Sequence, residues 1–117
     1  MISGSMTFAH DMMTLEKKLK KLGHTPTLPY GIDPHLKDSE FTNKLEENMQ
    51  FCIDDDVMMK NFKIIERQDG ILVFNKEKLG IKGYIGTSAL MEMAIAYFLG
   101  KKIFVMYDLP SFNTHRW

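Results

Sequence analysis

One short apolar run most constrains what this chain can fold into. Ile71-Leu72-Val73-Phe74 is rich in β-branched and aromatic residues and follows the turn signal Gln68-Asp69-Gly70. A strand with one solvated face alternates apolar and polar residues, whereas a strand of a parallel sheet is covered on both faces and forms an unbroken apolar run. The run therefore predicts a parallel strand, and parallel neighbours require long crossover connections, usually helical.

Helical and extended patterns alternate on either side of this strand. The expected helices, read from apolar residues three or four positions apart, cover about 7–22, 38–67 (two helices or one bent helix) and 88–99, and the other expected strands lie near residue 2, at 24–28 and at 103–106. This β-α-β-α-β-α-β order predicts one α/β domain over residues 1–117. We expect a three-layer sandwich, with a flavodoxin- or Rossmann-like parallel sheet of about four strands and helices on both faces.

The charge balance narrows the class of partner. The 117 residues include 15 Lys+Arg and 15 Asp+Glu, so the formal net charge is zero. Polymeric nucleic acids and acidic membrane surfaces are bound through an excess of basic residues, which this chain lacks. No segment has the roughly 18 to 20 consecutive apolar residues that span a bilayer. Binding to polymeric nucleic acid or to a membrane is therefore not expected.

Cysteine and histidine usage argues against a metal centre, and no cofactor is expected. Cys52 is the single cysteine, so no intrachain disulfide can form and a reducing, cytoplasmic setting is expected. Cys52 also falls on the apolar stripe of an expected helix, where burial disfavours a reactive thiolate. The four histidines are isolated in sequence and are expected at surface or loop positions: His10, His24, His35 and His115.

A single acid stands out. Glu92 is the only charged residue in the eighteen positions from Gly83 to Gly100. A helix that is apolar nearly all round is buried, and an ionised carboxylate on it is costly unless it meets donors or water. Such perturbed carboxylates often mark functional sites. The alternative is a structural glutamate that bonds backbone amides of the first turn or of a loop.

The first strand is followed by Ser3-Gly4-Ser5-Met6, small residues that let the backbone approach an anion at a helix N-terminus. In open parallel sheets, ligands bind beyond the carboxyl ends of the strands, which would bring this turn close to the loops at 29–34 and 75–87. The complete dinucleotide and P-loop fingerprints are absent. The alternative for this turn is an ordinary strand-to-helix connection.

These segments together resemble the nucleoside 2-deoxyribosyltransferase-like superfamily, which includes the deoxynucleoside-monophosphate N-glycosidases. The resemblance covers nearly the whole chain in order and spacing. The segments that carry it are Ile2-Ser3-Gly4-Ser5-Met6, Asp69-Gly70-Ile71-Leu72-Val73-Phe74-Asn75, Tyr84-Ile85-Gly86-Thr87 leading to Glu92-Met93-Ala94, and Gly100-Lys101-Lys102. It implies cleavage or transfer of an N-glycosidic bond in a nucleoside or its 5′-monophosphate.

The resemblance also implies roles for particular residues. Glu92 would be the nucleophile, because a retaining glycosyl transfer needs a carboxylate against the anomeric carbon. Family enzymes often carry an Asp at the position of Asn61, so Asp56, or its neighbours Asp54 and Asp55, is the candidate for that role. The implied substrate-binding residues are Ser3, Gly4, Ser5, Met6, Asn75, Tyr84, Gly86, Thr87 and Ser88. Members commonly complete their sites as homodimers, which is expected here too.

Three functions compete at this point. The first is an N-glycosidase or deoxyribosyltransferase that uses Glu92. The second is a nucleotide-binding or sensing module on the same fold without turnover, favoured by Asn61 in place of an acid, since fold similarity does not transmit function. The third is a structural or interaction protein in which Glu92 is only a satisfied core residue.

Overall fold

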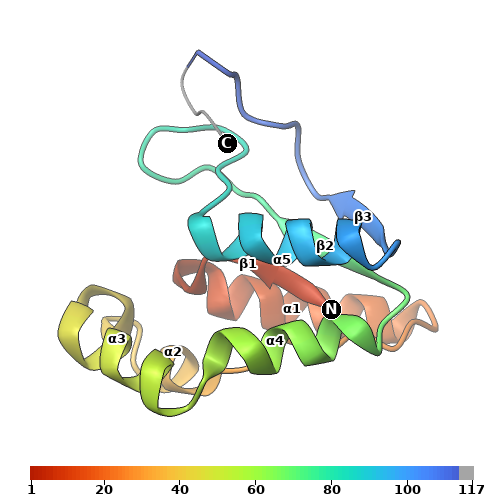
Figure 1. The fold of residues 1–117 in the computed structure, drawn as a ribbon. Coiled ribbons are helices and arrows are strands. Elements are labelled where there is room, and N and C mark those ends of the chain that lie inside the picture. The colour runs from red at the N-terminus through yellow and green to blue at the C-terminus, as the bar shows by residue number, and fades with distance from the viewer. Residues whose placement is uncertain (114–117) are drawn as a thin grey trace.

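The computed structural model describes residues 1–113 and shows a mixed α/β fold around a three-stranded parallel sheet (Figure 1). The strands are β1 (Ile2–Gly4), β2 (Gly70–Phe74) and β3 (Lys102–Val105), in the order β1-β2-β3. Both pairs are parallel, with Leu72 of β2 opposite Ile2 and Phe104. The apolar run predicted as a parallel strand is therefore the central strand.

The helices follow the predicted pattern, with one further helix and two 3-10 turns. The structure contains the 3-10 turns η1 (Met6–Phe8) and η2 (Phe41–Asn43) and the helices α1 (Ala9–Lys21), α2 (Asp33–Lys37), α3 (Leu45–Asp54), α4 (Val57–Glu66) and α5 (Thr87–Phe98). The 38–67 region forms two helices, with the acidic run at their joint. The short helix α2 occupies part of a segment that its two prolines predicted to be a loop.

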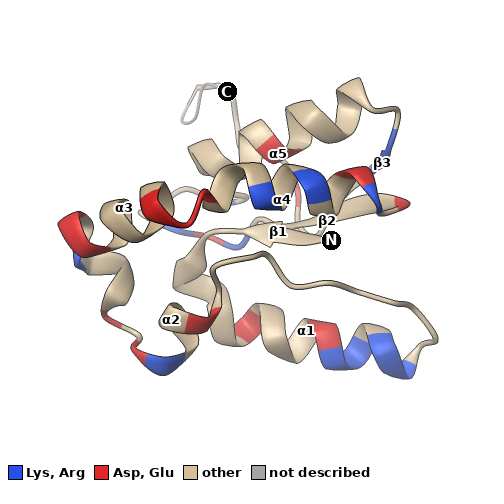
Figure 2. Ribbon diagram, turned by 60° about the horizontal axis from the view of Figure 1, so that its bottom comes forward, with Lys and Arg blue, Asp and Glu red and all other residues tan. Residues whose placement is uncertain are grey.

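Helices flank the sheet through two apolar clusters. Side chains alternate between the faces of a strand, so Leu72 and Phe74 point one way and Ile71 and Val73 the other. The first pair packs with α1 through Met12, and the second packs with α4 and α5. Figure 2 shows this arrangement, with α1 and α2 below the sheet and α4 and α5 above it.

The strand expected at 24–28 does not form, so the described residues contain three strands rather than about four. The segment is tethered beside β1 by one bond, in which the backbone N–H of Ile2 donates to the carbonyl of Thr27 at 2.9 Å. Pro26 and Pro29 lack the backbone N–H that a strand ladder requires, which explains why the pairing stops there.

The apolar stripe of α3 does not face the core, contrary to the expectation for this helix. Leu45, Met49 and Ile53 are exposed, and so is Cys52. The reason is the position of α3 at one end of the molecule (Figure 1), where it packs mainly against η2 and α4 rather than over the sheet.

One edge of the sheet is open. Phe104 of β3 lies on the same side as Leu72, and 56% of its surface is exposed. At the end of the neighbouring helix α5, Tyr97 and Phe98 are more than 80% exposed. Within residues 1–113, no helix is both long enough and apolar enough to cross a membrane.

Candidate functional site

A cavity of about 400 Å³ opens at the carboxyl ends of β1 and β2. Its volume falls within the range of about 300 to 1,000 Å³ that is typical of small-molecule sites. The turn after β1, the loop before α5 and the first turns of α5 line one side, and α2, α3 and α4 contribute the other. This is the edge at which open parallel sheets bind ligands.

Glu92 lies on the wall of this cavity and is only 5% exposed. Its side chain accepts a hydrogen bond from the Ser3 hydroxyl of β1. Burial raises the pKa of Glu92 to about 7, although the bond from Ser3 and the amino group of Met1 oppose that rise. Glu92 is the only charged residue of α5 (Figure 2), and it is the only acid among the described residues that line the cavity.

The loop between β2 and α5, residues 75–86, is anchored at its start by Asn75. The amide of this fully buried side chain bonds the backbone of the segment after β3, donating to the Tyr107 carbonyl at 2.9 Å and accepting from the Tyr107 N–H at 2.9 Å. Both ends of its amide thus hold the loop in place, and Asn75 is not among the residues that line the cavity.

Lys78 projects from this loop to the cavity and was not singled out by sequence reasoning. Its ammonium donates to the Ser5 hydroxyl at 2.8 Å and lies 5.4 Å from the centre of the Tyr84 ring. Partial burial lowers the pKa of Lys78. Among the described residues that line the cavity, Lys78 is the only lysine or arginine.

The part of the cavity lined by α2, η2, α3 and α4 carries both polar and aromatic side chains. His35 of α2 is buried, its Nδ1 lies 3.0 Å from the Thr42 hydroxyl, and its ring packs edge-on against Phe41. Burial lowers the pKa of His35 and so disfavours its charged form. The sequence placed His35 at a surface or loop position, which is wrong. Phe51 adds an aromatic ring to this part of the cavity.

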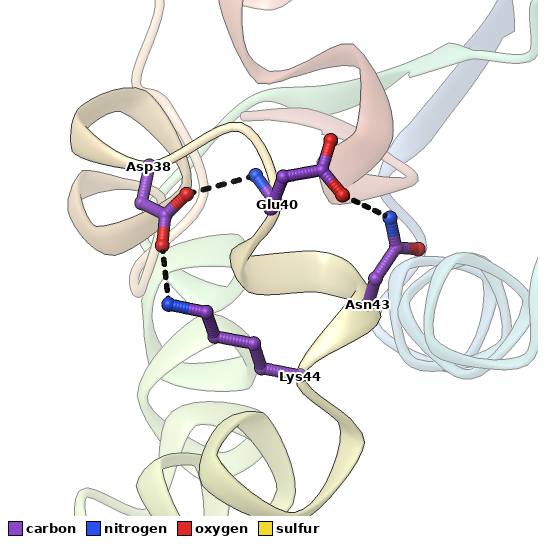
Figure 3. Close-up of polar contacts among 4 residues, drawn as sticks. All are labelled: Asp38, Glu40, Asn43 and Lys44. Carbon is purple, nitrogen blue, oxygen red and sulfur yellow. Dashed lines mark hydrogen bonds and ion pairs between the residues drawn. The ribbon is translucent and has the colours of Figure 1, made fainter.

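The connection that carries Thr42 is organised by a polar turn (Figure 3). The Asp38 carboxylate accepts from the backbone N–H of Glu40 at 2.9 Å and from the Lys44 ammonium at 2.8 Å. Asn43 donates to the Glu40 carboxylate at 2.8 Å. The Lys44 bond lowers the pKa of Asp38. These exposed contacts hold η2 beside α2, so that Thr42 meets His35.

Asn61 of α4 holds the backbone of Tyr30 in place. Its buried side chain accepts from the backbone N–H of Tyr30 at 2.7 Å and donates to the carbonyl of Tyr30 at 3.3 Å. It thereby clamps the 29–31 loop to the cavity wall. Asp56, the proposed substitute acid, is exposed at the start of α4 in the left-handed region (φ 47°) and does not line the cavity.

Most of the residues singled out from the sequence converge on the cavity. Those that line it are Gly4, Ser5, Met6, Tyr84, Gly86, Thr87, Ser88 and Glu92. Ser3 is fully buried and reaches Glu92, so it lies behind that residue rather than at the surface of the cavity. His115 lies outside the described residues. Within residues 1–113, no cluster of three or more potential metal ligands occurs.

No protein-family model matches the chain, and comparison with curated proteins and with solved structures also found no match.

Proposed function

We propose that this protein cleaves or transfers the N-glycosidic bond of a deoxynucleoside or its 5′-monophosphate, with Glu92 as the nucleophile, as a nucleoside 2-deoxyribosyltransferase-like enzyme. The observation that carries the proposal is the environment of Glu92. A carboxyl group that is 5% exposed, with a pKa raised by burial to about 7, lies on the wall of a cavity of about 400 Å³. Strongly perturbed carboxyl groups in clefts are the usual signature of acid–base or nucleophilic chemistry.

In the proposed reaction, the ionised Glu92 carboxylate forms a bond to the anomeric carbon of the sugar. The bond from that carbon to the base breaks, and its electron pair leaves with the base, which takes up a proton from water. Water, or a second base in the transfer reaction, then attacks the same carbon and releases the carboxylate. The carboxylate is poorly solvated before attack, so little water is displaced when the sugar arrives.

The two ends of the cavity fit the two ends of such a substrate. Phe51 and Met58 supply apolar contacts for a flat base, while Ser5 and Ser88 supply hydroxyls for the sugar side. Ser3 acts as a positioning residue, because its hydroxyl fixes one carboxylate oxygen of Glu92. The proposal needs no metal or cofactor.

A nucleotide-binding module without turnover is the second candidate. The specific observation in its favour is that the cavity has no second acid among its described lining residues. The amide of Asn61, at the position where the resemblance implies an acid, is fully engaged with Tyr30. Protonation of the leaving base would then depend on solvent, and turnover would be slow or absent.

The test is to incubate the protein with deoxynucleosides and their 5′-monophosphates and to measure free base by chromatography. Glu92→Gln is expected to lower the rate about 10³-fold or more, as removal of a nucleophile does. Glu66→Gln, an exposed glutamate at the end of α4, is the matched control and should keep full activity. Equal base release by wild type and Glu92→Gln would refute the enzyme proposal. Ligand-dependent thermal stabilisation without free base would favour the binding module.

We also propose the finer architecture implied by the resemblance. The sheet would be the centre of a flavodoxin- or Rossmann-like three-layer sandwich, supported by the apolar clusters on its two faces. A homodimer would cover the open β3 edge and the exposed Phe98, because unpaired edges and apolar patches favour association. The molar mass in solution, measured by light scattering, tests the dimer. The single thiol of Cys52 fits a cytoplasmic setting.

A further inference from the structure

The loop that carries Lys78 is built to hold this side chain at the cavity. Lys78 and Ile81 exchange two backbone hydrogen bonds, of 3.2 and 2.9 Å, across a two-residue turn. The central residues, Leu79 and Gly80, both have positive φ (54° and 73°), as the tightest hairpin turns require. Leucine is strained in that region, and observed strain of this kind tends to mark functional sites.

Burial of the Leu79 side chain does not compensate for this strain, because 79% of its surface is exposed. The consequence of the turn is instead the direction of Lys78, whose ammonium reaches Ser5 on the turn after β1. A second lysine of the loop, Lys76, forms an ion pair with Asp11 of α1 at 3.2 Å and ties the loop to that helix. The loop is therefore fastened to α1 two residues before Lys78.

The charges around Lys78 are unbalanced. In the part of the chain that the structure describes, no carboxylate lies within ion-pair distance of its ammonium. The hydroxyl of Ser5 and the ring of Tyr84 are its partners there, and neither carries a full negative charge. A partly buried ammonium without a counter-ion attracts an anion from solution.

Lys78 and Glu92 lie in the same cavity but at different places. The first turn of α5, with Thr87 and Ser88, lines the cavity close to the start of the helix, and Glu92 follows about 7 Å further along the helix axis, at about 1.5 Å per residue. The cavity thus holds a cation beside Ser5 and Tyr84, and a carboxyl group further along α5 than its first turn. A single ligand would contact both Lys78 and Glu92 if its anionic group and its reacting carbon lie apart in the molecule.

From this arrangement, and on the basis of the function proposed above, we infer that Lys78 recognises the phosphate of the substrate and makes the cavity selective for nucleoside 5′-monophosphates over free nucleosides. Ser5 would accept from the ammonium, and its hydroxyl, which donates to the Thr7 hydroxyl at 3.2 Å in this structure, would turn to donate to a phosphate oxygen. Lys78 is thus a specificity-determining residue and takes no part in bond cleavage.

The alternative is that Lys78 is only a latch that fastens the loop to Ser5. Lys78→Gln separates the two roles, because glutamine can still donate a hydrogen bond to Ser5 but carries no charge. The matched control is Lys82→Gln, which removes the same charge from an exposed position of the same loop that does not line the cavity.

The experiment measures the dissociation constants of 2′-deoxynucleoside 5′-monophosphates and of the matching deoxynucleosides by calorimetry, for wild type, Lys78→Gln and Lys82→Gln. Lys78→Gln should weaken monophosphate binding about tenfold to a hundredfold, the range for a hydrogen bond to a charged group, with nucleoside binding unchanged. Lys82→Gln should leave both constants unchanged. The wild-type preference for monophosphates should shrink as salt is added.

Three results would overturn the inference. If Lys78→Gln weakens the binding of monophosphates and of nucleosides equally, Lys78 only fastens the loop to Ser5. Unchanged binding of both ligands by Lys78→Gln, or no binding of any monophosphate by wild type, would also refute it. Free base measured in the same samples separates this inference from the proposed reaction. Selective monophosphate binding through Lys78 without free base would refute the reaction alone. Equal cleavage of nucleosides and monophosphates by wild type and Lys78→Gln would refute the role of Lys78 alone.

Discussion

The burial of Glu92 makes a quantitative prediction about stability that is independent of any substrate. The pKa of this carboxyl group rises from 4.5, its ordinary value, to about 7 in the fold. Below about pH 4 the group is protonated in both the folded and the unfolded chain, and above about pH 8 it is ionised in both. Between these limits the folded chain holds the proton more tightly, so the free energy of unfolding falls as pH rises.

The size of the effect follows from the shift. One pKa unit corresponds to about 1.4 kcal/mol, so the rise to about 7 is worth about 3 kcal/mol. Glu92→Gln removes the titration and keeps an oxygen that can accept from Ser3. Relative to wild type, the variant should therefore gain about 3 kcal/mol of stability between pH 4 and pH 8.

The assay is urea unfolding of both proteins at several pH values, followed by circular dichroism. Fixed costs of the substitution, such as an imperfectly bonded amide, cancel when the difference between the two proteins is compared across pH. Glu66→Gln, at an exposed position, serves as the control and should change the free energy of unfolding little. The argument from burial predicts that the stability of Glu92→Gln relative to wild type rises from pH 4 to pH 8. A relative stability that stays constant or falls over this range would refute it.

Two further predictions concern the contacts around the cavity. Because the Ser3 hydroxyl lowers the pKa of Glu92, Ser3→Ala should move the acidic limb of the pH–rate profile to higher pH and reduce turnover at pH 7 about tenfold; a limb that stays in place would mean that Ser3 does not hold the carboxylate. Leu79→Gly should stabilise the fold by about 1 kcal/mol in urea unfolding, because it relieves the positive φ, whereas Gly80→Ala should cost about as much; the opposite signs would show that the turn is not as described.

The parts of the fold that depend on one local pattern could be predicted from the sequence. Ile71–Phe74 has no polar position that could face water, which leaves the centre of a parallel sheet as its place. Glu92 could be singled out because it is the only charged residue in eighteen consecutive positions. The failed strand at 24–28 shows the limit, since an extended run becomes a strand only where its backbone finds a partner.

The missed residues depend on contacts between distant parts of the chain. Lys78 is one of thirteen lysines, and nothing near it in sequence shows that a tight turn will direct it to Ser5, 73 positions away. His35 reads as an isolated loop residue until α2 and η2 fold over it. Asn61 and Asn75 look alike in sequence, yet each binds a different backbone segment more than thirty residues away.

The loop before α5 also packs against the segment that follows β3. Gly83 (φ 71°) lies against the backbone of Asp108 so closely that a side chain at this position would collide with the Asp108 carbonyl oxygen. Asn75 bonds the same segment from the other end of the loop. The wall that presents Lys78 and Tyr84 is thus shaped by a stretch of chain that does not touch the ligand cavity. Sequence changes in residues 107–110 would therefore alter the shape of the cavity wall without replacing any residue that lines it.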